Sequence, residues 1–291
     1  MTPVIRDRAD RCPGVLRPWI AEDGALVRLR LVGGRVDAGA LRRLARIAEE
    51  SGDGVLYLTS RANVQIRGLA HTGGRLAPEV AEAVRATGLL PSPSHDRVRN
   101  IMVSPLTGLA GGRADLRPVA AELDRLLCAD PALAGLPGKF LFCLDDGRGD
   151  VSSRRLDAGL VALDASHVQL RAGTGLWGPV VGPDEAPAAL TELARRFLGV
   201  RGHGPRAAWH VDELPGAGRE LLGPGRPRDP RTRAVTPAPP FGCIPQDDGR
   251  RAEHLAVPGG ALSAKKAAEL ASRASWITVT PWRSVILPDL E

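Results

Sequence analysis

Residues 57–67 place cationic and amide side chains at alternating positions of a predicted β-strand that runs from 55 to 69. Successive side chains of a strand point to opposite faces, so every second residue shares a face. The even-numbered face is mostly apolar and suits burial, whereas the odd-numbered face has no carboxylate. That face carries Tyr57, Thr59, Arg61, Asn63, Gln65 and Arg67. Because arginine donates two parallel hydrogen bonds to a carboxylate, the row predicts a platform for a polyanion; an ordinary solvent face that carries arginine is the alternative.

Two further arginines, Arg28 and Arg30, alternate in a second predicted strand over residues 25–32. They share one face of this strand, and the apolar residues between and beside them form the other. We expect both arginines at the rim of the polyanion platform. Asp37 has the residue type of a helix N-cap, and a helix is predicted over 40–50.

A strand–helix–strand unit occurs twice in the chain. Gly33-Gly34 is echoed by Gly259-Gly260, each followed by a predicted helix, the second over 264–273. The threonine of the following strand recurs as Thr280. Two copies of one unit predict two halves that pair into one sheet, with residues 59–67 and 280–287 in neighbouring strands; chance similarity is the alternative. Trp282 occupies the position of Arg61 and is predicted to be a core or half-interface residue, with stacking on a ligand as the alternative.

The region between the two copies has its own pattern of elements. Helices are predicted over 119–127 and 186–198, and strands over 139–144 and 168–172. Residues 201–235 are rich in Pro, Gly and Arg, which is typical of a linker. The predicted domains are residues 1–92, 93–200 and 236–291, with 201–235 as the linker.

Composition excludes several functions. The net charge is +6, but Lys and Arg form no concentrated run and exposed aromatic stacking positions are lacking, which argues against nucleic-acid binding. No apolar run reaches the roughly 20 residues of a membrane helix, and the polar start lacks the apolar core of a signal peptide. We therefore expect a cytoplasmic protein that does not bind membranes.

The cysteines and histidines show no metal-ligand spacing. The four cysteines are Cys12, Cys128, Cys143 and Cys243, and no two of them lie closer than 15 positions. Structural metal sites bring ligands in close pairs, so we predict no metal site in the chain. Of the six histidines, His95 is the one near enough in sequence to Arg99 to reach a substrate held there.

Three motifs in order resemble those of nitrite and sulfite reductases. Residues 59–68 (TSRANVQIRG) resemble the strand of the ferredoxin-like half domain that faces the tetrapyrrole. This resemblance implies that Arg61 binds anion and tetrapyrrole. Residues 98–101 (VRNI) resemble the element with a second active-site arginine, here Arg99, followed by Asn100. Residues 136–140 (LPGKF) resemble the element with an active-site lysine, here Lys139, and Leu141 replaces the further lysine of sulfite reductases.

Four phrases are similar to the precorrin-3B synthase branch of this superfamily: residues 11–14, 136–142, 145–150 and 280–283. The resemblance implies an α+β fold, in which two ferredoxin-like half domains pair about a pseudo-twofold beside a central α/β domain. It implies an oxidoreductase of aerobic cobalamin biosynthesis that hydroxylates precorrin-3A with dioxygen and reducing electrons. The implied catalytic residues are Arg61, Arg99 and Lys139, and the implied substrate-binding residues are Thr59, Asn63, Gln65, Arg67, Arg28, Arg30 and Asn100.

The family's 4Fe-4S cluster is expected on a Cys-x5-Cys and a Cys-x3-Cys pair, and neither pair occurs. The chain ends directly after the second half-domain strand, which fits a natural short form, a split protein or a frame-shifted product. Two functions stay open. One is an enzyme whose cluster or electrons come from a separate polypeptide, and the other is a tetrapyrrole-binding module without turnover. In either case we expect the isolated chain to show no iron–sulfur absorption.

Overall fold

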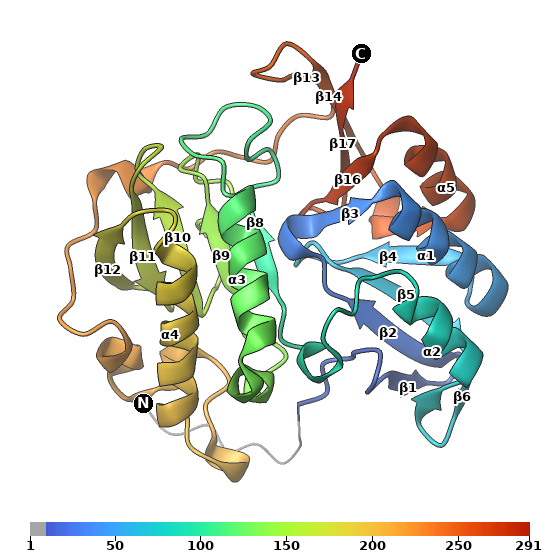
Figure 1. Cartoon of the computed structure of the whole chain (residues 1–291), viewed down its shortest axis with the longest axis horizontal. Coiled ribbons are helices and arrows are strands. Elements are labelled where there is room, and N and C mark those ends of the chain that lie inside the picture. The colour runs from blue at the N-terminus through green and yellow to red at the C-terminus, as the bar shows by residue number, and fades with distance from the viewer. Residues whose placement is uncertain (1–9) are drawn as a thin grey trace. The chain divides into compact units, whose positions relative to one another are not determined.

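The computed structural model describes residues 10–291, which form two compact units. The central unit is built on Val98–Pro237, and the paired-half unit comprises Cys12–Arg97 and Ala238–Glu291. Residues 1–9 of the first predicted domain lie outside the described part of the chain. Both units combine helices with sheets, so the predicted α+β class is confirmed (Figure 1).

The paired-half unit contains two five-stranded sheets. The first has, in order, β1 (Trp19–Ala21), β2 (Gly24–Leu29), β5 (Val64–Leu69), β4 (Val55–Leu58) and β15 (Ala261–Ser263). The second has, in order, β13 (Gly242–Pro245), β14 (Arg251–Leu255), β17 (Val285–Leu290), β16 (Trp276–Val279) and β3 (Arg35–Asp37). All neighbours are antiparallel. Each half therefore gives one three-residue strand to the sheet of the other half.

The two sheets repeat one another in register. Arg28 lies opposite Gln65 in the first sheet, and His254 lies opposite Ile286 at the equivalent position of the second. Both ladders also shift register at the equivalent place, between residues 25 and 27 and between residues 251 and 253. The internal repeat is thus real. The prediction that its two copies are neighbouring strands of one sheet is wrong, because β15 and β3 occupy the edges of β4 and β16.

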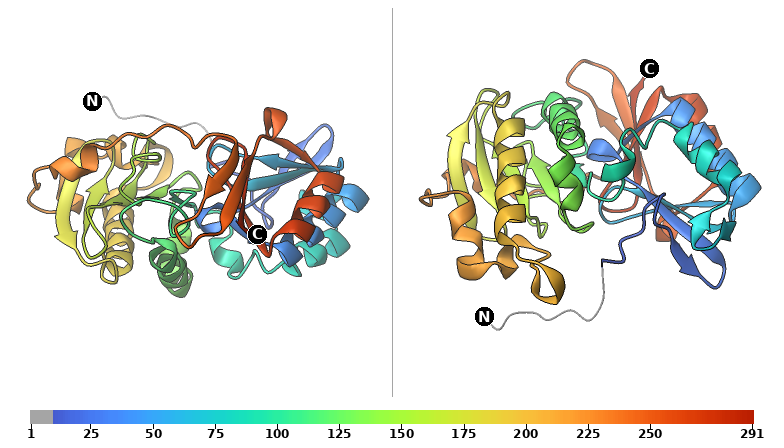
Figure 2. Two further views of the ribbon diagram at one scale, coloured as in Figure 1. Left: turned by 90° about the horizontal axis from the view of Figure 1, so that it is seen from above. Right: turned by 60° about the horizontal axis from the view of Figure 1, so that its bottom comes forward.

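Helices cover the core that the two halves share. They are α1 (Ala38–Ser51), α2 (Pro78–Arg85) and α5 (Ala264–Arg273). Helix α1 begins at the predicted cap, since Asp37 Oδ1 accepts from the Ala40 amide at 2.8 Å, and Ser263 caps α5 in the same way at 3.2 Å. Figures 1 and 2 show α1 and α5 side by side. Their apolar faces form one cluster with the buried faces of the strands.

The predicted strand over 55–69 is a hairpin. Strands β4 and β5 flank a tight turn, in which the Thr59 amide donates to the Asn63 carbonyl at 2.9 Å. Ala62 adopts a φ of 56°, which is unusual for a residue other than glycine. Alternation therefore does not run through residues 57–67, and Tyr57 lies directly opposite Gln65. The turn contains no glycine or proline, which is why the sequence did not predict it.

The central unit is a five-stranded mixed sheet with two helices. Its order is β12 (Leu176–Val181), β11 (Val168–Ala172), β10 (Ala158–Ala162), β9 (Phe142–Asp145) and β8 (Ile101–Val103). Strands β8, β9 and β10 are parallel, and the others are antiparallel. Helices α3 (Arg117–Ala129) and α4 (Ala186–Val200) pack side by side on the sheet (Figure 1). Phe140 anchors this packing, with ring centroids 5.1 Å from those of Phe142 and Phe197.

Residues 201–235, predicted as a linker, pack as part of the central unit. They form the short 3-10 helices η4 (Gly204–Arg206), η5 (Val211–Glu213), η6 (Pro215–Leu221) and η7 (Pro230–Arg233). Val211, Leu221 and Thr232 are buried. The Gln169 side chain bonds Pro227 O at 2.9 Å and the Asp229 amide at 2.9 Å. Proline and glycine fix tight turns here rather than a flexible connection.

The remaining elements are small. A two-stranded hairpin, β6 (His71–Thr72) and β7 (Arg75–Leu76), follows β5. Four more 3-10 helices are η1 (Val32–Gly34), η2 (Pro93–His95), η3 (Pro131–Gly135) and η8 (Pro258–Gly260). Helices η1 and η8 contain the two repeated double-glycine turns.

Candidate functional site

Arg28 stands at the centre of a polar face on the first sheet. Its Nε and Nη2 atoms both donate to Gln65 Oε1, at 2.9 and 2.5 Å. Gln65 is its direct cross-strand neighbour and lies opposite Tyr57 in turn, so the three side chains share one face. All three are partly exposed. Gln65 therefore fixes the plane of the Arg28 guanidinium and leaves Nη1 without a partner among residues 10–291.

Arg30 follows Arg28 on the same face but is buried, with 2% exposure, so the prediction of an exposed rim position is wrong for it. Its Nη1 atom donates to Pro13 O at 2.6 Å and to Arg28 O at 2.8 Å. Within the described residues, Nε and Nη2 are buried and find no hydrogen-bond partner. Burial, assisted by the charge of Arg28, lowers the pKa of Arg30 to about 10.

Arg28, Arg30 and Arg61 form a cluster of positive charges that repel one another. Burial lowers the pKa of Arg28, and the positive charge of Arg61 lowers it further. Asp96 supplies a compensating carboxylate near Arg30, but it is engaged by the amides of Val15 and Leu16 at 2.6 and 3.0 Å. A cluster of desolvated cations of this kind favours a bound anion.

Arg61 projects from the turn between β4 and β5 rather than from a strand. Thr59 Oγ1 accepts from the amides of Arg61 and Asn63 at 3.3 and 3.1 Å, which stabilises the turn. Asn63 is buried, and its Oδ1 accepts from the Leu31 amide at 2.9 Å. Thr59 and Asn63 thus stabilise the backbone of the turn that carries Arg61. Their predicted contact with a substrate stays a prediction.

Arg67 lies two positions beyond Gln65 and so on the same face. Its guanidinium carbon lies 5.2 Å from the centroid of the Tyr57 ring, and the Tyr57 hydroxyl donates to Asp53 Oδ2 at 2.7 Å. Arg67 is exposed. It therefore takes the outer position of the polar face that was predicted for Arg28 and Arg30.

The central unit carries the remaining predicted residues. Arg99 is 5% exposed and forms a two-point ion pair with Asp124 of α3, at 2.6 and 2.7 Å. Asn100 Nδ2 donates to Gly138 O at 3.0 Å, next to the exposed Lys139. Asn100 thereby positions the loop that presents Lys139. The convergence of Arg99 and Lys139 with Arg61 joins two units and stays a prediction.

His254 is the residue of the second half that stands where Arg28 stands in the first. Its Nε2 lies 2.7 Å from Ser284 Oγ, which lies 2.6 Å from Thr280 Oγ1. Its Nδ1 lies 3.0 Å from Pro239 O, so the ring spans two partners. His254 is 1% exposed, and burial lowers its pKa. The histidines show no metal-ligand spacing in sequence, but the repeat places His254 at the position of Arg28.

The cysteines do not fit a four-iron cluster. Cys143 is buried, its thiol donates to Val151 O at 3.4 Å, and burial raises its pKa. Cys12 is also buried, whereas Cys243 is exposed on β13. Among residues 10–291, which include all four cysteines, the one group of three possible metal ligands is acidic and consists of Asp145, Asp146 and Asp150. A four-iron cluster needs thiolates gathered around it, so these cysteines provide no site for one.

The acidic group is paired with a positive charge from its own loop, Arg148. Arg148 donates from Nε and Nη2 to Asp146, at 2.9 and 2.7 Å, and Asp145 accepts from the amides of Gly147 and Gly149, both at 2.9 Å. Burial raises the pKa of Asp150 to about 7. The loop 145–150 therefore satisfies Asp145 and Asp146, whereas Asp150 accepts from Ser104 Oγ at 2.7 Å and its Oδ2 is buried without a hydrogen-bond partner among the described residues.

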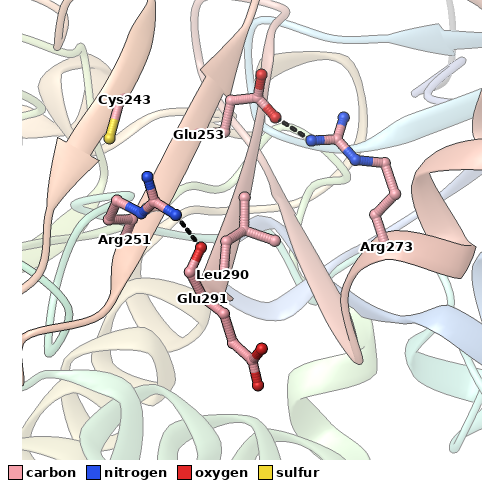
Figure 3. A pocket seen from close by; sticks show the side chains of 7 residues that line it. Cys243, Arg251, Glu253, Arg273, Leu290 and Glu291 are labelled. Carbon is pink, nitrogen blue, oxygen red and sulfur yellow. Dashed lines mark hydrogen bonds and ion pairs between the residues drawn. The ribbon is translucent and has the colours of Figure 1, made fainter.

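A cavity of about 420 Å³ lies on the second sheet, beside the end of α5 (Figure 3). Its cations are Arg251 and Arg273. Arg273 is paired with Glu253, and Arg251 donates to the Glu291 carbonyl. Because both are engaged, this cavity offers a weaker anion site than the polar face of the first sheet.

Comparisons with known proteins match the first half of the paired-half unit to a known domain family. Residues 20–72 match the family model described as nitrite/sulfite reductase ferredoxin-like half domain, which covers Arg28, Arg61 and Gln65. A precorrin-3B synthase from Sinorhizobium sp. is 31% identical over 201 residues, which are 65% of this chain and 42% of that protein. The chain is therefore similar to proteins of the nitrite/sulfite reductase superfamily.

A nitrite reductase and a solved structure are also similar to the chain. A ferredoxin–nitrite reductase from Leptolyngbya laminosa is 31% identical over 144 residues, 46% of this chain and 27% of that protein. The structure of the Mycobacterium tuberculosis NirA protein matches 99% of this chain and 58% of its own, with a TM-score of 0.67 and 19% identity. The chain spans less than half of the precorrin-3B synthase that it matches. None of the helices formed by residues 10–291 has the length and apolar character of a membrane span.

Proposed function

We propose that this chain binds an acidic tetrapyrrole of the precorrin type on the polar face of the first sheet, as a precorrin-3B synthase-like oxidoreductase. The observation that carries the proposal is the cluster of Arg28, Arg30 and Arg61. Its cations oppose one another, and Arg30 has two buried N–H groups without partners among the described residues. A precorrin carries several carboxylates, and a carboxylate placed against Arg28 would lower the repulsion within the cluster.

The affinity of such a contact follows from its chemistry. A hydrogen bond to a charged group contributes about 1.5–3 kcal/mol, so losing one should weaken binding roughly ten- to a hundredfold. Gln65 holds Arg28 in one plane, which reduces the conformational entropy lost on binding. Arg67 is exposed and screened by solvent and should matter less.

The oxidation itself needs electrons that these residues do not provide. The cysteines fit no cluster, so a separate cluster-bearing polypeptide or electron donor is part of the proposal, with dioxygen as the oxidant. The same cysteine arrangement favours the second candidate, a tetrapyrrole-binding module without turnover. Both candidates share the arginine cluster and differ in whether the bound precorrin is hydroxylated.

The test is a titration of sirohydrochlorin, a tetrapyrrole rich in carboxylates, into wild type, Arg61→Ala and Arg28→Ala. The control is Arg46→Ala, an exposed arginine on α1 of the same unit. We expect Arg28→Ala and Arg61→Ala to bind about tenfold or more weakly, and the control to match wild type. If all four proteins bind alike, the cluster is an ordinary arginine-rich surface and the proposal fails.

A second measurement separates the two candidates. Anaerobic reconstitution with iron and sulfide should leave the chain without the absorption of a four-iron cluster. Precorrin-3A with dioxygen and a chemical reductant should then give no hydroxylated product until a cluster-bearing electron donor is added. Product that forms after this addition supports the enzyme, and its absence supports the binding module.

A further inference from the structure

Two equivalent turns end the inner hairpins of the paired-half unit. In the first, Thr59–Asn63, the Thr59 amide donates to Asn63 O at 2.9 Å; in the second, Thr280–Ser284, the Thr280 amide donates to Ser284 O at 2.9 Å. The threonine Oγ1 of each turn accepts from the amides two and four residues later. Ala62 and Arg283 adopt the same left-handed backbone, with φ of 56° and 60°. The third residue of each turn is Arg61 in one and Trp282 in the other.

The two turns lie next to one another at the pseudo-twofold. A Cβ atom at Gly34 would lie 3.2 Å from Ala62 Cβ of the first turn and would collide with the Val279 carbonyl that precedes the second. A Cβ atom at Gly260 would lie 3.1 Å from Arg283 Cβ and 3.1 Å from the Leu58 carbonyl. Each double-glycine loop is thus held between the two turns, and glycine permits this close approach.

This arrangement puts Arg61 and Trp282 at the same end of the pseudo-twofold axis. A twofold rotation reverses directions across its axis but preserves height along it. Equivalent side chains on two turns beside the axis therefore leave the protein at one level. We expect a ligand over this end of the axis to meet Arg61 on one side and Trp282 on the other.

The two side chains differ in the ligand chemistry they favour. Trp282 is partly exposed, and within residues 10–291 its side chain has no hydrogen-bond, ring or cation partner. Arginine binds carboxylates at the periphery of a macrocycle, whereas an indole packs against the face of a conjugated ring. Because one turn carries a cation and the other an indole, the first half would bind the carboxylates of such a ligand and the second half would pack against its ring.

We propose that Trp282 stacks on the conjugated ring of the tetrapyrrole whose carboxylates Arg28 and Arg61 bind. This inference rests on the proposed function and adds a residue that determines specificity. Trp282 favours a flat macrocycle over a flexible polycarboxylate, which the arginines alone do not distinguish.

The experiment titrates sirohydrochlorin into wild type, Trp282→Ala, Trp282→Phe, Trp282→Leu and Arg61→Ala, at low and at high salt. The matched control is Trp276→Ala, a partly exposed tryptophan on β16 of the same unit. We expect Trp282→Ala to bind about tenfold more weakly at both salt concentrations, because stacking is not screened. Trp282→Phe should bind like wild type, and the effect of Arg61→Ala should shrink at high salt.

The outcomes separate this inference from the proposed function. If Arg61→Ala weakens binding and Trp282→Ala does not, the inference fails and the proposed function stands. If neither weakens binding, both fail. If Trp282→Ala does not fold, as judged by thermal melting, Trp282→Leu decides: it keeps apolar bulk without a flat face, so affinity equal to that of Trp282→Phe would overturn stacking.

Poly-glutamate serves as the second probe, since it offers carboxylates without a ring. Its binding should depend on Arg61 and salt, and should be the same for wild type and Trp282→Ala. A loss of poly-glutamate binding in Trp282→Ala would mean that Trp282 supports the shape of the arginine cluster rather than a ring.

Discussion

The two halves of the paired-half unit share one fold, but the sheet face that carries Arg28 in the first half differs from the equivalent face of the second half. On the first sheet, Arg28, Gln65 and Tyr57 form a partly exposed face, on which Arg28 donates two hydrogen bonds to Gln65. The equivalent residues of the second sheet are His254, Ile286 and Thr278, and all are buried. Register, caps and turns are kept, while the side chains of this face have changed from cationic to neutral. This face is therefore polar and partly exposed in the first half and packed in the second.

The comparison also explains which bonds were kept. Each turn retains its threonine and its left-handed residue, because these set the backbone shape. Asn63 uses its side chain to hold the Leu31 amide of its own half, whereas Ser284 bonds His254. The second half thus replaces a cation by a neutral, fully bonded pair, which suits burial.

The largest expected difference between the halves is in the cost of truncating the same position. Ile286→Ala should lower the free energy of unfolding by about 2–5 kcal/mol, because it opens a cavity. Gln65→Ala, its counterpart, should cost less than about 1 kcal/mol, since Gln65 is partly exposed. Urea denaturation of both variants measures this. Equal losses would show that the first face is as tightly packed as the second.

The next difference concerns the two double-glycine loops. Gly34→Ala and Gly260→Ala both put an L-residue into a left-handed backbone, at φ of 75° and 73°, which costs about 1–2 kcal/mol. At Gly34 the new Cβ also collides with a backbone carbonyl, whereas at Gly260 part of the contact is with the movable Arg283 side chain. Gly34→Ala should therefore lower the melting temperature more than Gly260→Ala. The reverse order would mean that the loop at Gly34 relaxes freely.

Local chemistry made part of this structure predictable. Asp37 as a cap, the helix over 264–273 and the strand over 168–172 follow from periodicity and residue type, and the structure contains all three. Repeated glycines and threonines showed the duplication. The strand exchange stayed hidden, because β3 and β15 have only three residues each and no distinctive pattern.

The site was less predictable for a related reason. The sequence motifs identified Arg61, Arg99 and Lys139 as site residues, but the partners of these residues come from distant parts of the chain. Asp124, which binds Arg99, lies on a helix whose sequence gives no sign of that contact. Gln65 was predicted to bind substrate; in the structure it holds Arg28 of the neighbouring strand β2, and it faces Tyr57 across the hairpin that was predicted as one strand.

The smallest expected difference is a pH dependence that belongs to the second half alone. Burial lowers the pKa of His254 below its ordinary value of 6.5, whereas Arg28 stays charged throughout this range. As pH falls through about 6.5, the unfolded chain gains a proton that the folded chain does not, so stability is present above this pH and is lost below it. The free energy of unfolding of wild type, measured relative to that of His254→Asn, should therefore decrease between neutral pH and about pH 5, because the raised pKa of Asp150 affects both proteins alike. The control is His167→Gln, an exposed histidine beside Asp164, which should keep the wild-type slope.

Parallel pH profiles of wild type and His254→Asn would show that His254 is protonated as easily in the folded chain as in the unfolded one. In that case the buried face of the second half would be more open to solvent than the bonds of His254 to Ser284 and Pro239 indicate.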